Sequence, residues 1–137
     1  MDQIKSIAIQ WFEAFNQHNI DKLLDLYHND AEHYSPKLKI HQPETNGLIK
    51  GKAALRNWWT DAFQRLPHLH YKVIKLTADE AQVFMEYIRQ TPGEADLNVG
   101  EVLEIRGKKA VVQIGMLPMQ FDMVDLICVE KIIEEEA

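Results

Sequence analysis

The pattern of apolar and polar residues divides the chain into a helical first half and a strand-rich second half. Between residues 2 and 16, apolar residues recur at steps of three and four, which predicts an amphipathic helix. The same spacing predicts helices over residues 21–28 and 52–66. Between them, residues 31–35 alternate like a short strand that Pro36 stops, and residues 37–50 have no sustained period and are expected to form a loop.

From residue 69 onward the period changes to two. Alternation predicts strands over residues 69–77, 82–91, 96–106 and 110–117, joined by short turns into an antiparallel meander. Three helices followed by such a meander indicate an α+β domain in which the helices cover one face of a curved sheet. We expect a single domain over residues 1–137, whose tail, residues 118–137, is either helical or an extension of the sheet.

Composition excludes several classes of protein. The 137 residues are 46% hydrophobic, which is enough to form a core, and the lone Cys128 allows no disulfide within the chain. A net charge of −6 argues against nucleic-acid binding, which needs a cationic face. The sequence contains no apolar run long enough to cross a membrane and no secretory signal, so we expect a cytoplasmic protein.

Four stretches of the sequence resemble the nuclear transport factor 2-like superfamily, and within it the SnoaL-like branch, which is related to ketosteroid isomerases and polyketide cyclases. They are WFEAFN with DKLLDLY in residues 11–27, NDAEHYSP in residues 29–36, KGKAAL in residues 50–55 and EVLEIRGK in residues 101–108. The resemblance implies a cone-shaped curved antiparallel sheet, a cystatin-like α+β barrel, covered by three N-terminal helices. It further implies an enclosed apolar pocket and a homodimer formed through the outer face of the sheet.

The strand before Pro36 is where the resemblance places working groups of the pocket. Ser35 stands where ketosteroid isomerases carry a carboxylate base, and serine is not basic near neutral pH. Trp11 stands at the position of the isomerase tyrosine, and its indole N–H can donate a hydrogen bond but cannot relay a proton. His33 is the candidate base, since its ordinary pKa lies near neutrality. The alternative is a histidine that is only hydrogen-bonded in the pocket wall.

Glu101 is the candidate acid. At this strand position the isomerases carry an acid that stays protonated and donates to a developing oxyanion. Glu101 shares a strand face with Val99, Leu103 and Ile105, which predicts a raised pKa. The alternatives are an ion pair with Arg89 or a lysine, or a carboxylate exposed at a frayed strand. Residues 114–117 are uncharged, which weakens a cyclase assignment, because the cyclases place an acid there.

Apolar and aromatic residues are expected to line the pocket, as suits a hydrophobic small molecule. They are Trp11, Trp58, Trp59, Phe63, Met85, Tyr87 and Met116, with Ser35 as a polar neighbour. The alternative is that they belong to the core. Because Trp58 and Trp59 are adjacent, we expect one to pack and the other to line the rim. The histidines lack metal-ligand spacing, so no metal and no cofactor is expected.

Three functions remain open at the level of sequence. The first is a SnoaL-like pocket protein that binds a small apolar molecule containing a carbonyl group or a ring. Such a protein could act as a weak isomerase, cyclase or hydrolase through His33 and Glu101. The second is a non-catalytic ligand-binding or dimeric interaction module of the same fold. The third is a protein-partner role for the outer face of the sheet, as in the transport members of the superfamily that the chain resembles.

Overall fold

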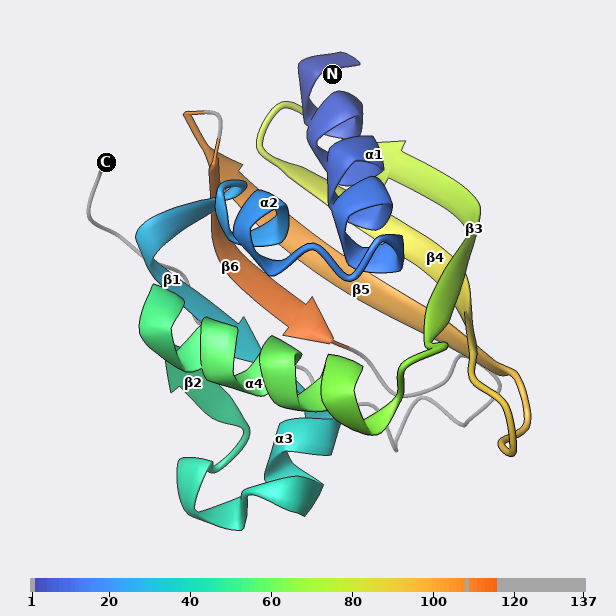
Figure 1. The fold of residues 1–137 in the computed structure, drawn as a ribbon. Coiled ribbons are helices and arrows are strands. Elements are labelled where there is room, and N and C mark those ends of the chain that lie inside the picture. The colour runs from blue at the N-terminus through green and yellow to red at the C-terminus, as the bar shows by residue number, and fades with distance from the viewer. Residues whose placement is uncertain (1, 108, 116–137) are drawn as a thin grey trace.

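The computed structural model describes residues 2–107 and 109–115. Its helices, shown in Figure 1, are α1 (Asp2–Asn16), α2 (Ile20–Leu24), α3 (Pro36–His41), the 3-10 turn η1 (Pro43–Thr45) and α4 (Lys52–Arg65). Its strands are β1 (Tyr27–Tyr34), β2 (Leu48–Lys50), β3 (His70–Ala78), β4 (Gln82–Gln90), β5 (Leu97–Arg106) and β6 (Lys109–Gly115). The expected tail, residues 118–137, and Met116 lie outside the described residues.

The strands form one sheet in the order β2-β1-β6-β5-β4-β3. The meander from β3 to β6 is antiparallel, as the alternation predicts, and β1 joins it by pairing parallel with β6. That parallel pair places His33 beside Gln113, while the antiparallel β5–β6 pair places Leu103 on the other side of Gln113. Residues from opposite ends of the chain therefore meet at the middle of the sheet.

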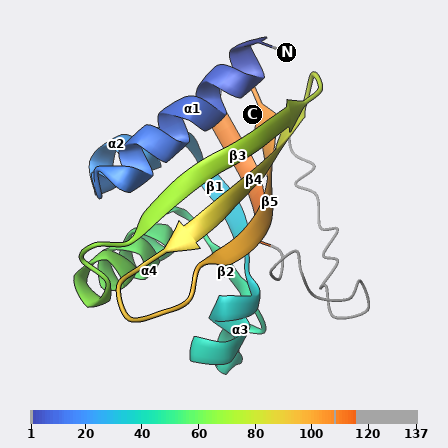
Figure 2. The same ribbon diagram turned by 90° about the vertical axis from the view of Figure 1, so that its right-hand side faces the viewer.

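Helices α1 and α4 lie on the same side of this curved sheet (Figure 2). The α+β class and the curved sheet predicted from the sequence are confirmed. On β4 the inward residues are Val83, Met85, Tyr87 and Arg89, all buried, while the residues between them are partly exposed. In the part of the chain that the structure describes, no helix is both long enough and apolar enough to cross a membrane.

Aromatic rings of α1 make the contact between that helix and the sheet. Trp11 and Phe15 are fully buried and stack with ring centroids 5.1 Å apart. Phe15 in turn stacks on Tyr71 of β3, with centroids 3.9 Å apart. Trp11 is therefore part of the core, because its fully buried ring packs among Phe12, Phe15 and Tyr71.

Two local predictions are wrong. The helix predicted over residues 21–28 ends at Leu24, because Tyr27 pairs with Ala110 and starts β1 four residues earlier than the alternation indicates. Long-range strand pairing here overrides the local helical pattern.

The loop predicted over residues 37–50 contains α3, η1 and β2. Ser35 caps α3 by accepting a hydrogen bond from the Lys37 backbone N–H at 3.1 Å, and Pro36 occupies the first turn. The short strand β2 then pairs with β1. A Ser-Pro pair is a helix-start signal, and it predicts a helix here that hydrophobic periodicity alone does not.

The side chain of Asn16 links the end of α1 to β3 by pairing with both backbone polar groups of one residue, as a neighbouring strand would. Its side-chain amide donates to the Tyr71 carbonyl oxygen at 2.9 Å, and its Oδ1 accepts from the Tyr71 N–H at 2.8 Å. We expect Asn16→Ala to lower the free energy of unfolding by about 1–3 kcal/mol, because two partly buried backbone groups lose their partner. Urea denaturation measures this, with Gln17→Ala, at an exposed neighbouring position, expected to stay within about 0.5 kcal/mol of the parent.

Candidate active site

The carboxyl group of Glu101 lies at the centre of the inward face of the sheet and is 4% exposed. The Tyr87 hydroxyl donates to its Oε1 at 2.8 Å, and the Gln113 amide donates to its Oε2. Burial raises the pKa of Glu101 to about 7, and the two hydrogen bonds offset only part of that effect. A neutral, hydrogen-bonding carboxylic acid is therefore available near neutral pH.

A directed chain of hydrogen bonds leads from α1 to this carboxyl group. The Trp11 indole N–H donates to the Tyr27 hydroxyl at 2.9 Å, and Tyr27 donates to the side-chain oxygen of Gln113. Gln113 then donates to Glu101. All of these side chains are buried, so each donor is held in place where water does not compete for it.

His33 lies beside Gln113 on β1 and is 2% exposed. Burial lowers the pKa of His33 to about 4, and a hydrogen bond with the Gln113 side chain opposes that shift. Among the described residues, neither its Nδ1 nor the indole Nε1 of Trp59 has a hydrogen-bond partner. The two rings are neighbours, with centroids 5.5 Å apart, so two unpaired polar atoms lie close together in the interior.

Burial reverses the usual order of the two pKa values. Between about pH 4 and pH 7, His33 is neutral and Glu101 is protonated. An ordinary glutamate and histidine would carry opposite charges over most of this range. The pair joined by Gln113 thus consists of an uncharged base and an uncharged acid, which is the arrangement that general acid–base chemistry requires.

A cavity of about 50 Å³ lies between the helices α3 and α4 and the strands β3 and β4. The residues that line it are Lys37, His41, Trp58, Trp59, Ala62, Arg65, Leu66, Leu69, Tyr71 and Arg89. Trp59 lines this cavity and also packs against His33. Tyr71 lines it too, and its ring stacks on that of Tyr87 with centroids 4.1 Å apart. The cavity therefore borders the buried acid–base pair through these two aromatic side chains.

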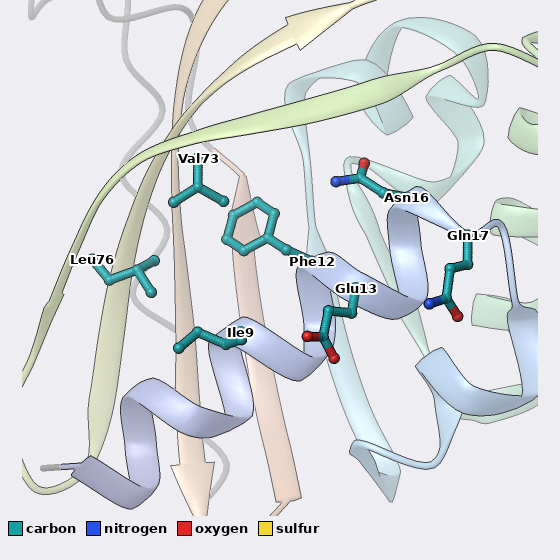
Figure 3. A pocket seen from close by; sticks show the side chains of 7 residues that line it. All are labelled: Ile9, Phe12, Glu13, Asn16, Gln17, Val73 and Leu76. Carbon is teal, nitrogen blue, oxygen red and sulfur yellow. The ribbon is translucent and has the colours of Figure 1, made fainter.

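A larger hollow lies elsewhere, between α1 and β3. This groove has a volume of about 460 Å³. The side chains that line it, drawn in Figure 3, are Ile9, Phe12, Glu13, Asn16, Gln17, Val73 and Leu76. Its walls are mainly apolar, and neither His33 nor Glu101 contributes to it. The smaller cavity is accordingly the candidate site, because it borders the titratable groups.

The residues predicted to line one pocket have different positions and roles in the structure. Met85 and Tyr87 lie on the inward face of β4, and Phe63 packs against Phe15 in the core. Trp11 donates to Tyr27, and Ser35 caps α3. Trp58 and Trp59 both line the cavity, so the expectation that only one of them would do so is wrong. Consecutive helical residues lie only about 100° apart around the helix axis, so both large rings can reach the same opening.

Sequence reasoning missed Gln113, Tyr27 and Tyr71. The sequence does contain a signal for a functional role of Gln113, because it is a polar residue at an inward position of an otherwise apolar strand, residues 110–114. Among the residues that the structure describes, Glu101 forms no ion pair, and Arg89 pairs with Glu94 instead. Within residues 2–107 and 109–115, no three His, Cys, Asp or Glu side chains lie together in a way that could hold a metal ion.

The curved α+β sheet and its inward acid define a cone-shaped fold of the nuclear transport factor 2-like type. The chain belongs to the SnoaL-like domain family, whose sequence model matches residues 8–113. A comparison with curated proteins finds no match.

Solved structures share this fold at low sequence identity. A SnoaL-like protein of unknown function from Burkholderia thailandensis is 23% identical with a TM-score of 0.76, over 84% of this chain and 93% of that one. TerC, co-crystallised with polyporic acid, is 16% identical with a TM-score of 0.73, over 86% and 93% of the two chains. A putative polyketide cyclase from Sinorhizobium meliloti is 15% identical with a TM-score of 0.68, over 80% and 93%.

The raised pKa of Glu101 predicts a pH-dependent stability difference between the parent protein and Glu101→Gln. Below its ordinary pKa of 4.5 the carboxyl is protonated in both the folded and the unfolded state. As the pH rises toward about 7, only the unfolded state releases the proton, so the parent loses stability relative to the variant. We expect the difference in unfolding free energy to fall by about 1.4 kcal/mol per pH unit over that window.

Urea denaturation at a series of pH values measures this difference. The matched control is Glu80→Gln, which changes an exposed carboxylate on the β3–β4 turn and should give a nearly constant difference. A constant difference for Glu101→Gln as well would show that the carboxyl of Glu101 titrates alike in the folded and unfolded states.

Proposed function

We propose that this SnoaL-like domain binds a small ring-containing carbonyl compound at the cavity and catalyses a cofactor-free proton transfer on it. In this reaction His33 is the base, and Glu101 supplies the proton that reaches the carbonyl oxygen. The observation that carries the proposal is the buried Glu101 carboxyl, which accepts from Tyr87, whose ring stacks on Tyr71 of the cavity wall. The outcome is an enolisation, which is the step shared by isomerases and cyclases of this kind.

The tyrosine pair can deliver the proton because protonation of Glu101 reverses the direction of its hydrogen bonds. When Glu101 is ionised, it accepts the hydrogen of the Tyr87 hydroxyl, so the neighbouring Tyr71 hydroxyl receives none from Tyr87. When Glu101 is protonated, it donates to Tyr87, Tyr87 donates to Tyr71, and the Tyr71 hydrogen is free for a ligand oxygen. Burial raises the pKa of both tyrosines, so the hydroxyls stay protonated and act as a relay.

On the other side, Trp59 separates the cavity from His33. A ring that enters must move the Trp59 indole, because that side chain lines the cavity and packs against the imidazole. The displaced indole exposes the unpaired Nδ1 of His33, which is neutral above about pH 4 and can accept a proton from ligand carbon. The unpaired indole N–H is then available to the ligand oxygen.

The structural relatives support a ring-containing ligand. One relative was crystallised with polyporic acid and another is described as a putative polyketide cyclase. The aromatic walls contributed by Trp58, Trp59 and Tyr71 suit a flat ring, because stacked aromatic contacts add to the burial of apolar area.

The second candidate is a non-catalytic binding module that also forms a homodimer through the outer face of the sheet. The observation in its favour is the small volume of the cavity, about 50 Å³, which holds a polar group but not a whole ring unless side chains move. Partly buried apolar residues on the outer face of the sheet, Phe84, Ile88 and Val102, are consistent with a partner there. Light scattering distinguishes a dimer from a particle of 15.9 kDa.

Exchange of α-hydrogens for deuterium in 2-tetralone, followed by NMR at about pH 6, tests the proposed chemistry. We expect the protein to accelerate the exchange. Tyr71→Phe and Glu101→Gln should each reduce this acceleration roughly 100-fold, because the proton no longer reaches the carbonyl oxygen.

The matched control is Tyr34→Phe, which removes a hydroxyl that contacts Glu32 at 3.4 Å outside this network and should leave the rate within about twofold. Binding of the ketone without any acceleration of exchange would contradict the proposed chemistry and favour the non-catalytic module.

A further inference from the structure

Cationic side chains gather around the cavity in a chain whose net charge is −6. Lys37 from α3, Arg65 from the last turn of α4 and Arg89 from β4 all line it. Arg65 is paired with Asp61, one turn earlier on α4, at 2.8 Å. The nearby anions do not balance this cluster, because Glu94 is the only other carboxylate that interacts with Arg89 or Lys37 among the described residues.

Glu94 holds its place through an ion pair with Arg89, whose Nη1 lies 2.7 Å from the Glu94 carboxylate. The two partners differ in burial, since the side chain of Arg89 is 7% exposed and that of Glu94 is 50% exposed. Glu94 belongs to the β4–β5 turn, in which Gly93 has a φ of +87°, a left-handed conformation that favours glycine. An exposed carboxylate on a surface turn therefore neutralises a buried guanidinium.

The electrostatic environment favours a negative charge at this place. The hydrogen bond from Arg89, followed by its charge and that of Lys37, holds the pKa of Glu94 below its ordinary value. Partial burial, followed by repulsion from Arg89 and Arg65, lowers the pKa of Lys37. A carboxylate enclosed by the cavity would relieve this repulsion more effectively than Glu94, because it would be less screened by water.

We infer that the ligand is a ring-containing carboxylic acid whose carboxylate pairs with Arg89 and Lys37 in place of Glu94. The inference rests on the proposed function, because it describes the substrate of the same site. The cavity of about 50 Å³ is large enough for a carboxylate group, and the aromatic rings of Trp58 and Trp59 border the same space. Glu94 is then an internal competitor that the ligand displaces.

A matched pair of probes tests this inference, namely 2-naphthoate and its uncharged analogue 2-naphthamide. Isothermal titration calorimetry gives both affinities, and the Trp59 indole N–H signal in an NMR spectrum reports whether the cavity is occupied. We expect naphthoate to bind at least about tenfold more tightly than naphthamide, because only the acid pairs with the buried cation.

Variants of the charged residues should change the preference for the acid in opposite directions. Glu94→Gln removes the competitor and should strengthen naphthoate binding about threefold to tenfold, with little effect on naphthamide. Lys37→Gln should weaken naphthoate binding by a similar factor. The matched control is Glu80→Gln, which makes the same change of charge at the other end of β4 and should leave both affinities unchanged. All of these positions are exposed, so the variants are expected to fold.

Equal affinities for the two probes, with no effect of Glu94→Gln, would overturn the inference. That result would leave the proposed function standing, because the exchange of 2-tetralone does not depend on a carboxylate. Failure of both probes to bind would also overturn the inference. Conversely, a clear preference for naphthoate without any acceleration of tetralone exchange would support the carboxylate site and count against the proposed catalysis.

Discussion

The buried Glu101 carboxyl is the group on which the interior of this domain is organised. Side chains from three other strands and one helix converge on it, since Trp11, Tyr27 and Gln113 form one line of donors and Tyr87 donates separately. An unpaired carboxyl in this position would cost several kilocalories per mole, so the network has to be satisfied as a unit. The same contacts hold α1 and β1 against the middle of the sheet.

The burial that requires this network to be satisfied also sets the protonation states on which the proposed proton transfer depends. Because burial dominates both shifts, the glutamate keeps its proton and the histidine stays neutral, and Gln113 lies between them. The cationic side chains line the cavity, where the buried guanidinium of Arg89 is neutralised by Glu94. The site thus has an uncharged interior and a positively charged entrance, an arrangement suited to a molecule with an apolar ring and an acidic group.

The sequence was sufficient for the architecture and for part of the site. Period-two alternation put Glu101 and Tyr87 on the inward face, because β4 and β5 each bury mainly the residues of one face. It could not reveal that β1 pairs parallel with β6, and so the contact between His33 and Gln113 was not predicted. For Ser35 the sequence predicted a role that the structure does not show. Its position in a motif suggested a place in the pocket, but its hydroxyl caps a helix. Residues 118–137 and Met116 remain predictions.

The reversed pKa order of His33 and Glu101 is tested most directly by NMR titration of the folded protein, with the Glu101 carboxyl carbon and the His33 ring nitrogens observed together. The account predicts that Glu101 loses its proton only near pH 7 and that the His33 ring remains uncharged down to about pH 4. A Glu101 carboxylate that is ionised at pH 5, or a His33 ring that gains its proton near its ordinary pKa of 6.5, would contradict it.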